Sequence, residues 1–249
     1  MEWSDDAIVL SVRPHGESGA ILEVLTRGHG RHLGLVRGGA SRTRKPVLQP
    51  GNGVRLAWRA RLSEHLGSFT AELDRARAGS LMESREALIG LNAFAAVAGA
   101  TLPERAPYYD PVFEASNILL DAMLEDGLAH WGALYVRWEA GLLESLGFGL
   151  DLSQCAATGS QEDLRYVSPR SGRAVSREAG APFAAKLFKL PAFLLGSQNA
   201  DVGAADIVAG LLLTGHFLHE RVLRPHGKDL PSARLRLDAL AAHEEGESK

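Results

Sequence analysis

The sequence predicts an α+β protein in which an N-terminal five-stranded β-barrel of the oligonucleotide-binding (OB) fold precedes an all-helical domain with an irregular insert. Two observations support this fold class. Up to about residue 77 apolar residues alternate with period two, and beyond residue 80 the period changes to about 3.6. A chain of 249 residues is long enough for two domains, which we expect at residues 1–79 and 80–249.

Five short strands account for the first domain. Each is rich in β-branched or alternating apolar residues and is bounded by glycine, proline or polar turn residues. The expected strands cover residues 7–12, 20–26, 32–36, 53–61 and 66–73. No long helical pattern separates them, so a small closed barrel is favoured over a β-α-β unit.

Helical periodicity dominates the second domain. Helices are expected at about residues 81–98, 112–123, 130–146, 181–194, 201–223 and 230–243. The third should end at Gly147, a residue type that favours helix C-termini. Residues 149–182 are rich in Ser, Gly and Pro, and they predict the irregular insert.

Composition excludes several classes of protein. The N-terminus is acidic, unlike a signal peptide, and no apolar run reaches the roughly 18 residues of a membrane helix, so we expect a soluble, cytoplasmic protein that does not contact membranes. Cys155 is the only cysteine, so it can form no internal disulfide and no cysteine-based metal site. We expect no cofactor.

Charge is distributed unevenly along the chain. Residues 1–79 contain 12 Lys and Arg against 8 Asp and Glu, whereas residues 80–249 contain 15 against 22. Nine cations lie between residues 27 and 61, where there is no carboxylate. They are Arg27, Arg31, Arg37, Arg42, Arg44, Lys45, Arg55, Arg59 and Arg61. Such a cluster indicates polyanion binding, although a solvated basic face without a ligand is the simpler alternative.

Residues 37–45 are the centre of this cluster, with two glycines, small residues and four of the nine cations. We expect an open, mobile loop that wraps a phosphate backbone with little sequence preference and a steep salt dependence. The rings of Trp58 and Phe69 are available to stack on bases, but their alternation equally permits burial in the barrel core.

Other motifs are weak. The glycines between residues 28 and 34 have the wrong spacing for a dinucleotide-binding loop and precede a strand. His216, His219 and His226 lack a carboxylate at a defined spacing, so we interpret them as polar residues at a helix end and not as metal ligands. No catalytic motif is present, and we assign no catalytic residue.

Three segments resemble the RecO family of bacterial DNA repair and recombination mediators. The first, residues 35–42 with the Leu-Gln-Pro at 48–50, is similar to the family's basic loop. The second is the most specific, with Arg-Trp-Glu at 137–139, a leucine stripe, Leu-Gly-Phe-Gly at 146–149 and then Cys155. The third is residues 228–234, and together the segments span nearly the whole chain.

The resemblance implies a function that composition does not show. It implies binding of single- and double-stranded DNA, annealing of complementary strands, and loading of RecA onto DNA coated with single-strand-binding protein. It also implies capture of that protein's C-terminal tail by the helical domain, RecR as a second partner, and a location at the nucleoid. Our candidates for tail binding are Arg137, Trp138 and Leu142, although an ion pair of Arg137 within the fold is an equally good interpretation.

One departure from the family concerns metal. Many members carry a four-cysteine zinc module in the insert, and the corresponding positions here are Cys155, Thr158, Ser176 and Ala179. Three of the four ligands are absent. We therefore expect a zinc-free insert held by apolar packing.

Three alternatives stay open. An RNA-binding OB-fold protein of RNA processing or translation would show the same basic barrel. A hydrolase would use Cys155 or the His216 and His219 pair. A structural scaffold would not retain DNA even at low salt.

Overall fold

The computed structural model describes residues 1–106, 110–196 and 202–247. The chain forms two compact units, Met1–Glu125 and Asp126–Lys249. The first contains a β-barrel and three helices, and the second contains further helices and a small sheet, so the predicted α+β class is confirmed. No helix in the described ranges is long and apolar enough to cross a membrane.

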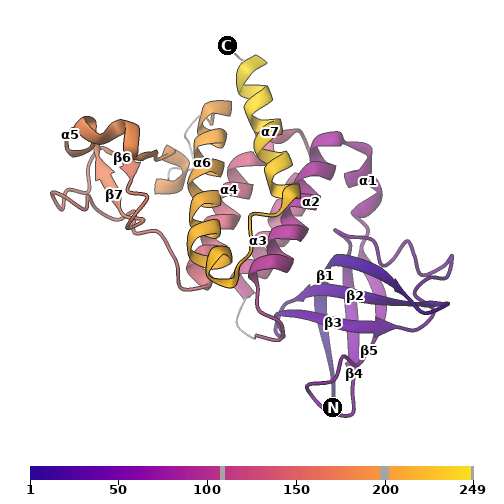
Figure 1. Ribbon diagram of the computed structural model, residues 1–249. Coiled ribbons are helices and arrows are strands. Elements are labelled where there is room, and N and C mark those ends of the chain that lie inside the picture. The colour runs from indigo at the N-terminus through magenta and orange to yellow at the C-terminus, as the bar shows by residue number, and fades with distance from the viewer. Residues whose placement is uncertain (107–109, 197–201, 248–249) are drawn as a thin grey trace. The chain divides into compact units, whose positions relative to one another are not determined.

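Five strands close into a barrel at the start of the first unit (Figure 1). They are β1 (Glu2–His15), β2 (Gly19–Thr26), β3 (Arg31–Val36), β4 (Gly53–Arg59) and β5 (Ser68–Arg75). Their order around the barrel is β1-β2-β3-β5-β4, with β3 parallel to β5 and the other pairs antiparallel. This is the expected OB barrel.

The barrel core is built by alternation along the strands, which sends every second side chain inward. Trp58 and Phe69 are 2% and 4% exposed and belong to this core. The Phe69 ring packs on Gly34, where a Cβ would lie 2.5 Å from the ring. The alternation therefore buries both rings, and they are not available as a stacking surface.

Three helices follow the barrel, namely α1 (Ala78–Glu83), α2 (Arg85–Thr101) and α3 (Asp110–Ala122). The sequence predicted α1 and α2 as one helix. Ser84 divides them because its backbone is extended and its hydroxyl accepts the N–H of Ala87 at 3.2 Å, which starts a new helix.

A buried amide joins the barrel to these helices. The Asn52 side chain accepts hydrogen bonds on Oδ1 from the backbone N–H groups of Arg77 and Ala78, both at 2.9 Å. Its Nδ2 donates to the carbonyls of Pro46 at 2.8 Å and Val47 at 3.2 Å. These four bonds use the full capacity of the amide, as burial requires.

Arg77 extends this junction to α3. Its side chain is 2% exposed, and Nε donates to Asp121 at 2.6 Å while Nη2 donates to Oδ1 of Asn117 at 2.9 Å. The change from strand to helix falls between Arg75 and Ala78, close to the expected boundary at residue 79. The first compact unit nevertheless includes α1, α2 and α3. The hydrogen bonds of Asn52 and Arg77 are among the contacts that join these helices to the barrel.

Helices α4 (Leu128–Ser145), α6 (Ala204–Phe217) and α7 (Ser232–Glu247) form the body of the second unit. Gly147 follows α4 with a φ of 83°, the left-handed conformation expected of it. A Cβ on Gly210 would lie 2.8 Å from Val136, so the absence of a side chain there lets α4 and α6 approach closely.

A fully buried ion pair fastens these three helices. Arg234 of α7 donates from Nε and Nη2 to the carboxylate of Glu139 on α4, at 2.6 and 3.0 Å, and both side chains are 0% exposed. Thr214 of α6 donates its hydroxyl to the same carboxylate. The guanidinium also donates to the carbonyl of Leu211 and to Asp238, so both buried charges are hydrogen-bonded.

The insert contains a small antiparallel sheet, which the sequence did not predict. Its strands are β6 (Leu164–Val167), β7 (Ala174–Ser176) and β8 (Phe188–Lys189), in the order β7-β6-β8. The short helix α5 (Arg177–Gly180) follows β7, and Figure 1 labels α5 beside β6 and β7. Strands this short and punctuated by glycine carry too little periodicity to be recognised.

The helix expected at residues 181–194 is wrong. The structure has two 3₁₀ turns, η1 (Ala181–Lys186) and η2 (Ala192–Leu195), on either side of β8. Pro191 lies inside the expected helix, where it would remove a backbone donor and clash with the preceding turn. The apolar residues here therefore pack as a strand and turns.

Cys155 is the one cysteine among the four positions at which the family resemblance places a zinc module. Its side chain is buried, and Sγ accepts the N–H of Ser176 at 3.2 Å, while the hydroxyls of Thr158 and Ser176 also bond to it. Burial raises the pKa of the thiol, but these hydrogen bonds outweigh that effect and lower the pKa to about 6. One sulfur with hydroxyl neighbours is not a zinc donor set, and the described residues contain no group of three His, Cys, Asp or Glu that could hold a metal.

The buried ion pair gives a first prediction. Changing Arg234→Met should lower the free energy of unfolding by about 3–5 kcal/mol, because it leaves the Glu139 carboxylate buried without a partner. Urea unfolding measures this loss. Arg224→Met is the control, since Arg224 is 68% exposed and pairs with Glu220 on the surface, where a change below about 1 kcal/mol is expected. Equal losses in the two variants would contradict the structural role.

The single cysteine gives a second prediction. The ultraviolet absorbance of the thiolate should titrate with a midpoint at about pH 6, and Cys155→Ser should abolish the signal. Because the pKa in the folded protein lies below the value of about 8.5 for a free thiol, the thiolate adds stability above that value, and this stability is lost as the pH falls through about 6. A midpoint above pH 8 would show that the hydrogen bonds do not favour the thiolate.

Candidate nucleic-acid interface

The basic segment after β3 is folded and is not the open, mobile loop that we expected. Its backbone forms successive hydrogen-bonded turns. The carbonyl of Ser41 accepts the N–H groups of Arg44 and Lys45 at 3.2 and 3.0 Å, and the carbonyl of Arg44 accepts the N–H of Leu48 at 3.2 Å. Leu48 is 2% exposed and lies in the barrel core. The glycines at 38 and 39 serve a tight turn, so they do not make the segment flexible.

Both ends of this segment are attached to the barrel. The N–H of Ala40 donates to Ser18 in the β1–β2 turn at 3.0 Å, and the N–H of Gly51 donates to Val9 of β1 at 2.9 Å. The side-chain amide of Asn52 donates hydrogen bonds to the carbonyls of Pro46 and Val47 within the segment. We call residues 37–52 the pinned loop, because these bonds fix its backbone.

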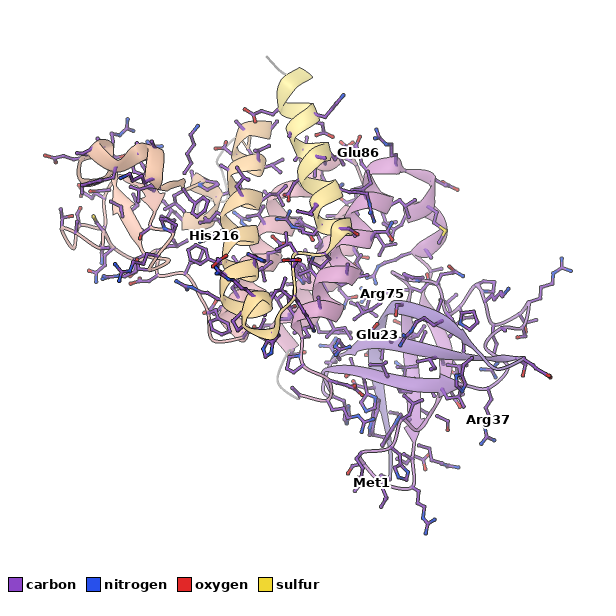
Figure 2. The ribbon with its side chains drawn as sticks, viewed as in Figure 1. Met1, Glu23, Arg37, Arg75, Glu86 and His216 are labelled. Atoms are coloured by element: carbon purple, nitrogen blue, oxygen red, sulfur yellow. The ribbon has the colours of Figure 1, made fainter. Side chains whose placement is uncertain are left out.

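Four cations project from the pinned loop into solvent. Arg37, Arg42, Arg44 and Lys45 are exposed, and none forms an ion pair with any residue that the structure describes. Figure 2 shows the Arg37 side chain extending outward from this end of the barrel. We call these four residues the loop cations. Because no described carboxylate neutralises them, their positive charge is available to an anionic ligand.

Arg13 is a cation of this end of the barrel that sequence reasoning missed. It is exposed on β1, opposite Ile21 of β2. It lies outside the basic window of residues 27–61, and only the register of the β1–β2 hairpin brings it to the same end as the pinned loop. Glu17 in the hairpin turn is the carboxylate nearest to it in sequence.

A small cavity lies beneath the pinned loop. It has a volume of about 320 Å³, and its lining combines apolar side chains with one cation. The lining residues are Val12, Pro14, Ala20, Gly39, Ala40, Lys45, Leu48 and Gln49. An apolar hollow beside an exposed ammonium can accept a sugar or base while the ammonium binds the adjoining phosphate.

Arg27 and Arg31 are engaged by the fold. Arg27 pairs with Asp110 at 3.0 Å and with Glu114, and it stacks on the Phe113 ring. Arg31 is 17% exposed, pairs with Glu23 at 2.5 Å and donates to the carbonyl of Leu102. Both side chains connect the barrel to its own helices.

The cations of β4 face carboxylates on the neighbouring strand. The register places Glu2 opposite Arg59 and Asp6 opposite Arg55, and the pairs have N···O distances of 2.9 and 3.5 Å. Arg61, in the following loop, is exposed and has no ion pair with the described residues. The pairs on β4 are exposed, so a phosphate could compete for them, but at a cost that the loop cations do not have.

The nine predicted cations therefore do not form one continuous track. In the β2–β3 hairpin, Ala20 pairs with Val36 at one end and Leu25 pairs with Arg31 at the other. The loop cations lie at the first end, while Arg27 and Arg31 lie at the second. The structure brings together four of the nine.

Aromatic side chains gather at the second end. Trp3 stacks on His29 with ring centroids 4.0 Å apart, and both line a cavity of about 520 Å³ with His32 and Arg105. Burial is the main effect that lowers the pKa of His32. No sequence pattern predicts this group, because Trp3 and His29 meet only through the pairing of β1 with its neighbours.

Of the three predicted partner-binding residues, two are buried and one lines a cavity. Trp138 and Leu142 are 2% and 0% exposed, so they pack inside the second unit and offer no surface to a partner. Arg137 is partly buried, donates from Nε and Nη2 to the carbonyl of Phe193 at 3.1 and 2.9 Å, and lines a cavity of about 420 Å³. Of the three, Arg137 is the one that a ligand could reach.

Comparison with known proteins identifies the family. The family model "Recombination protein O N terminal" matches residues 1–76, and "Recombination protein O C terminal" matches residues 82–230. DNA repair protein RecO of Rhodospirillum rubrum is 52% identical over 239 residues, which cover 95% of this chain and 94% of that protein. The proteins of the same name from Cereibacter sphaeroides and Rhizobium etli are 52% and 51% identical, over 97% and 94% of this chain and 99% and 90% of their own lengths. The chain therefore belongs to the RecO family of DNA repair proteins.

Proposed function

We propose that this protein is a DNA-binding recombination mediator. It binds single- and double-stranded DNA, anneals complementary strands and helps to load RecA onto DNA coated with single-strand-binding protein. The observation that carries the proposal is the pinned loop, where four exposed cations that pair with no described carboxylate stand on a hydrogen-bonded backbone at one end of an OB barrel. Membership of a family of DNA repair proteins supports DNA as the ligand.

Annealing follows from charge neutralisation. Two complementary strands repel each other through their phosphates, and each phosphate that a cation neutralises also releases condensed counterions. The loop cations can do this without forming or breaking a covalent bond, so the proposal needs neither nucleotide hydrolysis nor a catalytic residue. Cys155, the nucleophile of the hydrolase alternative, is 1% exposed and out of reach of a substrate.

The partners belong to the same proposal. The cavity beside Arg137 has apolar walls that include Leu150, Leu152 and Phe193, and a cation beside an apolar pocket suits the acidic, hydrophobic C-terminal tail of single-strand-binding protein. Glu144 also lines the cavity and would oppose an acidic tail, so we place the tail carboxylates at the Arg137 end. RecR is the second proposed partner, and the proposed location is the cytoplasmic nucleoid.

Neutralising the pinned loop tests the DNA claim. In the triple variant Arg42→Gln, Arg44→Gln, Lys45→Gln, the slope of log K against log salt for an oligothymidylate should fall in magnitude by about 2, because each single-strand phosphate contact contributes about 0.7. Fluorescence anisotropy over a salt series gives the slope, and strand annealing measured on the same variant should slow.

The matched control is Arg55→Gln, Arg59→Gln, Arg61→Gln, which removes the same charge from β4 and its loop. Two of these arginines are already paired with Glu2 and Asp6, so the change in slope should be smaller than in the loop variant. Equal slopes in the two variants would refute the assignment to the loop cations. A strand of matched RNA that binds tighter than DNA would favour the RNA-binding alternative.

Arg137→Ala tests the partner claim. Annealing of bare strands should be unchanged, whereas annealing of strands coated with cognate single-strand-binding protein should fall to the level seen when that protein lacks its tail. Arg224→Ala, an exposed arginine of the same unit, is the control and should leave both reactions unchanged. Normal annealing of coated strands by Arg137→Ala, with a normal thermal midpoint, would exclude this pocket as the tail site.

A further inference from the structure

The insert of the second unit carries six cations on and around its small sheet, although the helical half of the chain is acidic overall. Residues 149–196 contain six Lys and Arg and four Asp and Glu. The six are Arg165, Arg170, Arg173, Arg177, Lys186 and Lys189. A count over residues 80–249 hides this excess, because most of the carboxylates lie elsewhere.

Three of these cations line one cavity. Arg165 and Lys189 come from β6 and β8, Arg177 comes from α5, and the cavity has a volume of about 300 Å³. All three side chains are exposed, and Lys189 has no ion pair with the described residues. The walls include Leu190 and Pro191, so the cavity combines apolar surface with positive charge.

Asp163 orients the two arginines of this cavity. Its carboxylate accepts Nε of Arg165 at 2.9 Å and Nε of Arg177 at 2.8 Å, and its backbone carbonyl accepts the N–H of Arg177. The residue has a φ of 49°, a left-handed conformation that Asp and Asn adopt more readily than other side chains. Since the ion pairs are about half exposed, they contribute little to stability, and their main effect is to hold the two guanidinium groups in place.

A fixed aromatic ring completes the cavity. Tyr166 lies opposite Lys189 in the β6–β8 pairing, and its ring packs so tightly on Gly180 that a Cβ there would be 2.4 Å from it. Stacking of a base on a ring that is already immobilised loses little side-chain entropy. Asp206 is the one carboxylate in the lining, and it is engaged in accepting the N–H of Gly203 at 3.2 Å.

We propose that this cavity is a second binding site for a single nucleic-acid strand. Arg165, Arg177 and Lys189 hold phosphates, Tyr166 stacks on a base, and Asp163 is a positioning residue that aims the guanidinium groups. Three cations and one aromatic ring in the same cavity suit a phosphate next to a base, which favours a nucleic-acid strand over an acidic peptide. The identity of the ligand as a nucleic acid rests on the proposed function, but the site is separate from the pinned loop.

Asp163→Asn gives the most discriminating test. Asparagine tolerates a positive φ and keeps the shape of the side chain, but it cannot hold two guanidinium groups by charge. Removal of a negative charge would strengthen strand binding if only net charge mattered. We expect instead about threefold weaker binding of an oligothymidylate. Without the carboxylate the two arginine side chains are free to move, so the conformational entropy lost when the strand orders them reduces the affinity. Binding as tight as wild type, or tighter, would overturn the positioning role.

The phosphate contacts are tested by Arg165→Gln with Arg177→Gln, which should lower the salt slope by about 1.4. Arg170→Gln with Lys186→Gln is the matched control, since both residues are exposed and neither lines the cavity. Photocrosslinking of a 5-iodouracil strand should label the tryptic peptide Tyr166–Arg170, and Tyr166→Leu should remove that label.

These measurements are made on the full chain, both wild type and with the neutralised pinned loop, so the two sites can fail separately. Absence of the crosslink from the wild-type chain, together with normal loop-dependent binding, would sink the second site and leave the proposed function intact. If the wild-type chain forms the crosslink but the variant with the neutralised pinned loop binds strands as tightly as wild type, the second site stands and the assignment to the loop cations fails. If the cavity variants bind strands normally but lose an acidic peptide, the cavity is a peptide site and the inference is wrong.

Discussion

The side chain of Asn52 is the contact on which the arrangement of the first unit depends. Its Nδ2 holds the carbonyls of two loop residues, and its Oδ1 accepts the first N–H groups of the helical segment. The surface that presents the loop cations and the start of α1 are therefore fixed by one amide. Because the amide is buried, an unmade bond would leave a desolvated polar group at a cost of about 1–3 kcal/mol. This cost explains why a segment with two glycines nevertheless adopts one hydrogen-bonded conformation.

Features that depend on local periodicity could be predicted from the sequence. The five strands, α3 and α4 lie close to where the alternating and helical patterns place them, because burial of one face imposes those periods. The short strands of the insert were missed since three or four residues define no period. The pinned loop was taken as open because its glycines and small residues match a flexible segment, and the buried Leu48 and Asn52 that fix it are set by tertiary contacts.

The site was predictable only in part, and strand register explains the difference. A window of residues 27–61 contains no carboxylate, yet β1 brings Glu2 and Asp6 directly opposite two of its arginines. Charge counted along the sequence is therefore a poor guide to charge on a sheet, where neighbours come from distant segments. The loop cations escape this pairing because their segment lies outside the ladder. The cations around the small sheet were overlooked for a related reason, since a sum over 170 residues averages opposite local charges.

The chain uses its charged residues in two ways that follow from solvation. Arg234 and Glu139 are completely buried, and such a pair is tolerable only because every charged atom is matched by a hydrogen bond. The loop cations are exposed and hydrated, so they contribute nothing comparable to folding. Among the residues that the structure describes, no carboxylate pairs with the loop cations, so a phosphate that binds them displaces no internal partner and gains the full effect of counterion release. This difference in pairing is the reason why we propose the pinned loop, and not the paired arginines of β4, as the stronger attractor for a nucleic-acid strand.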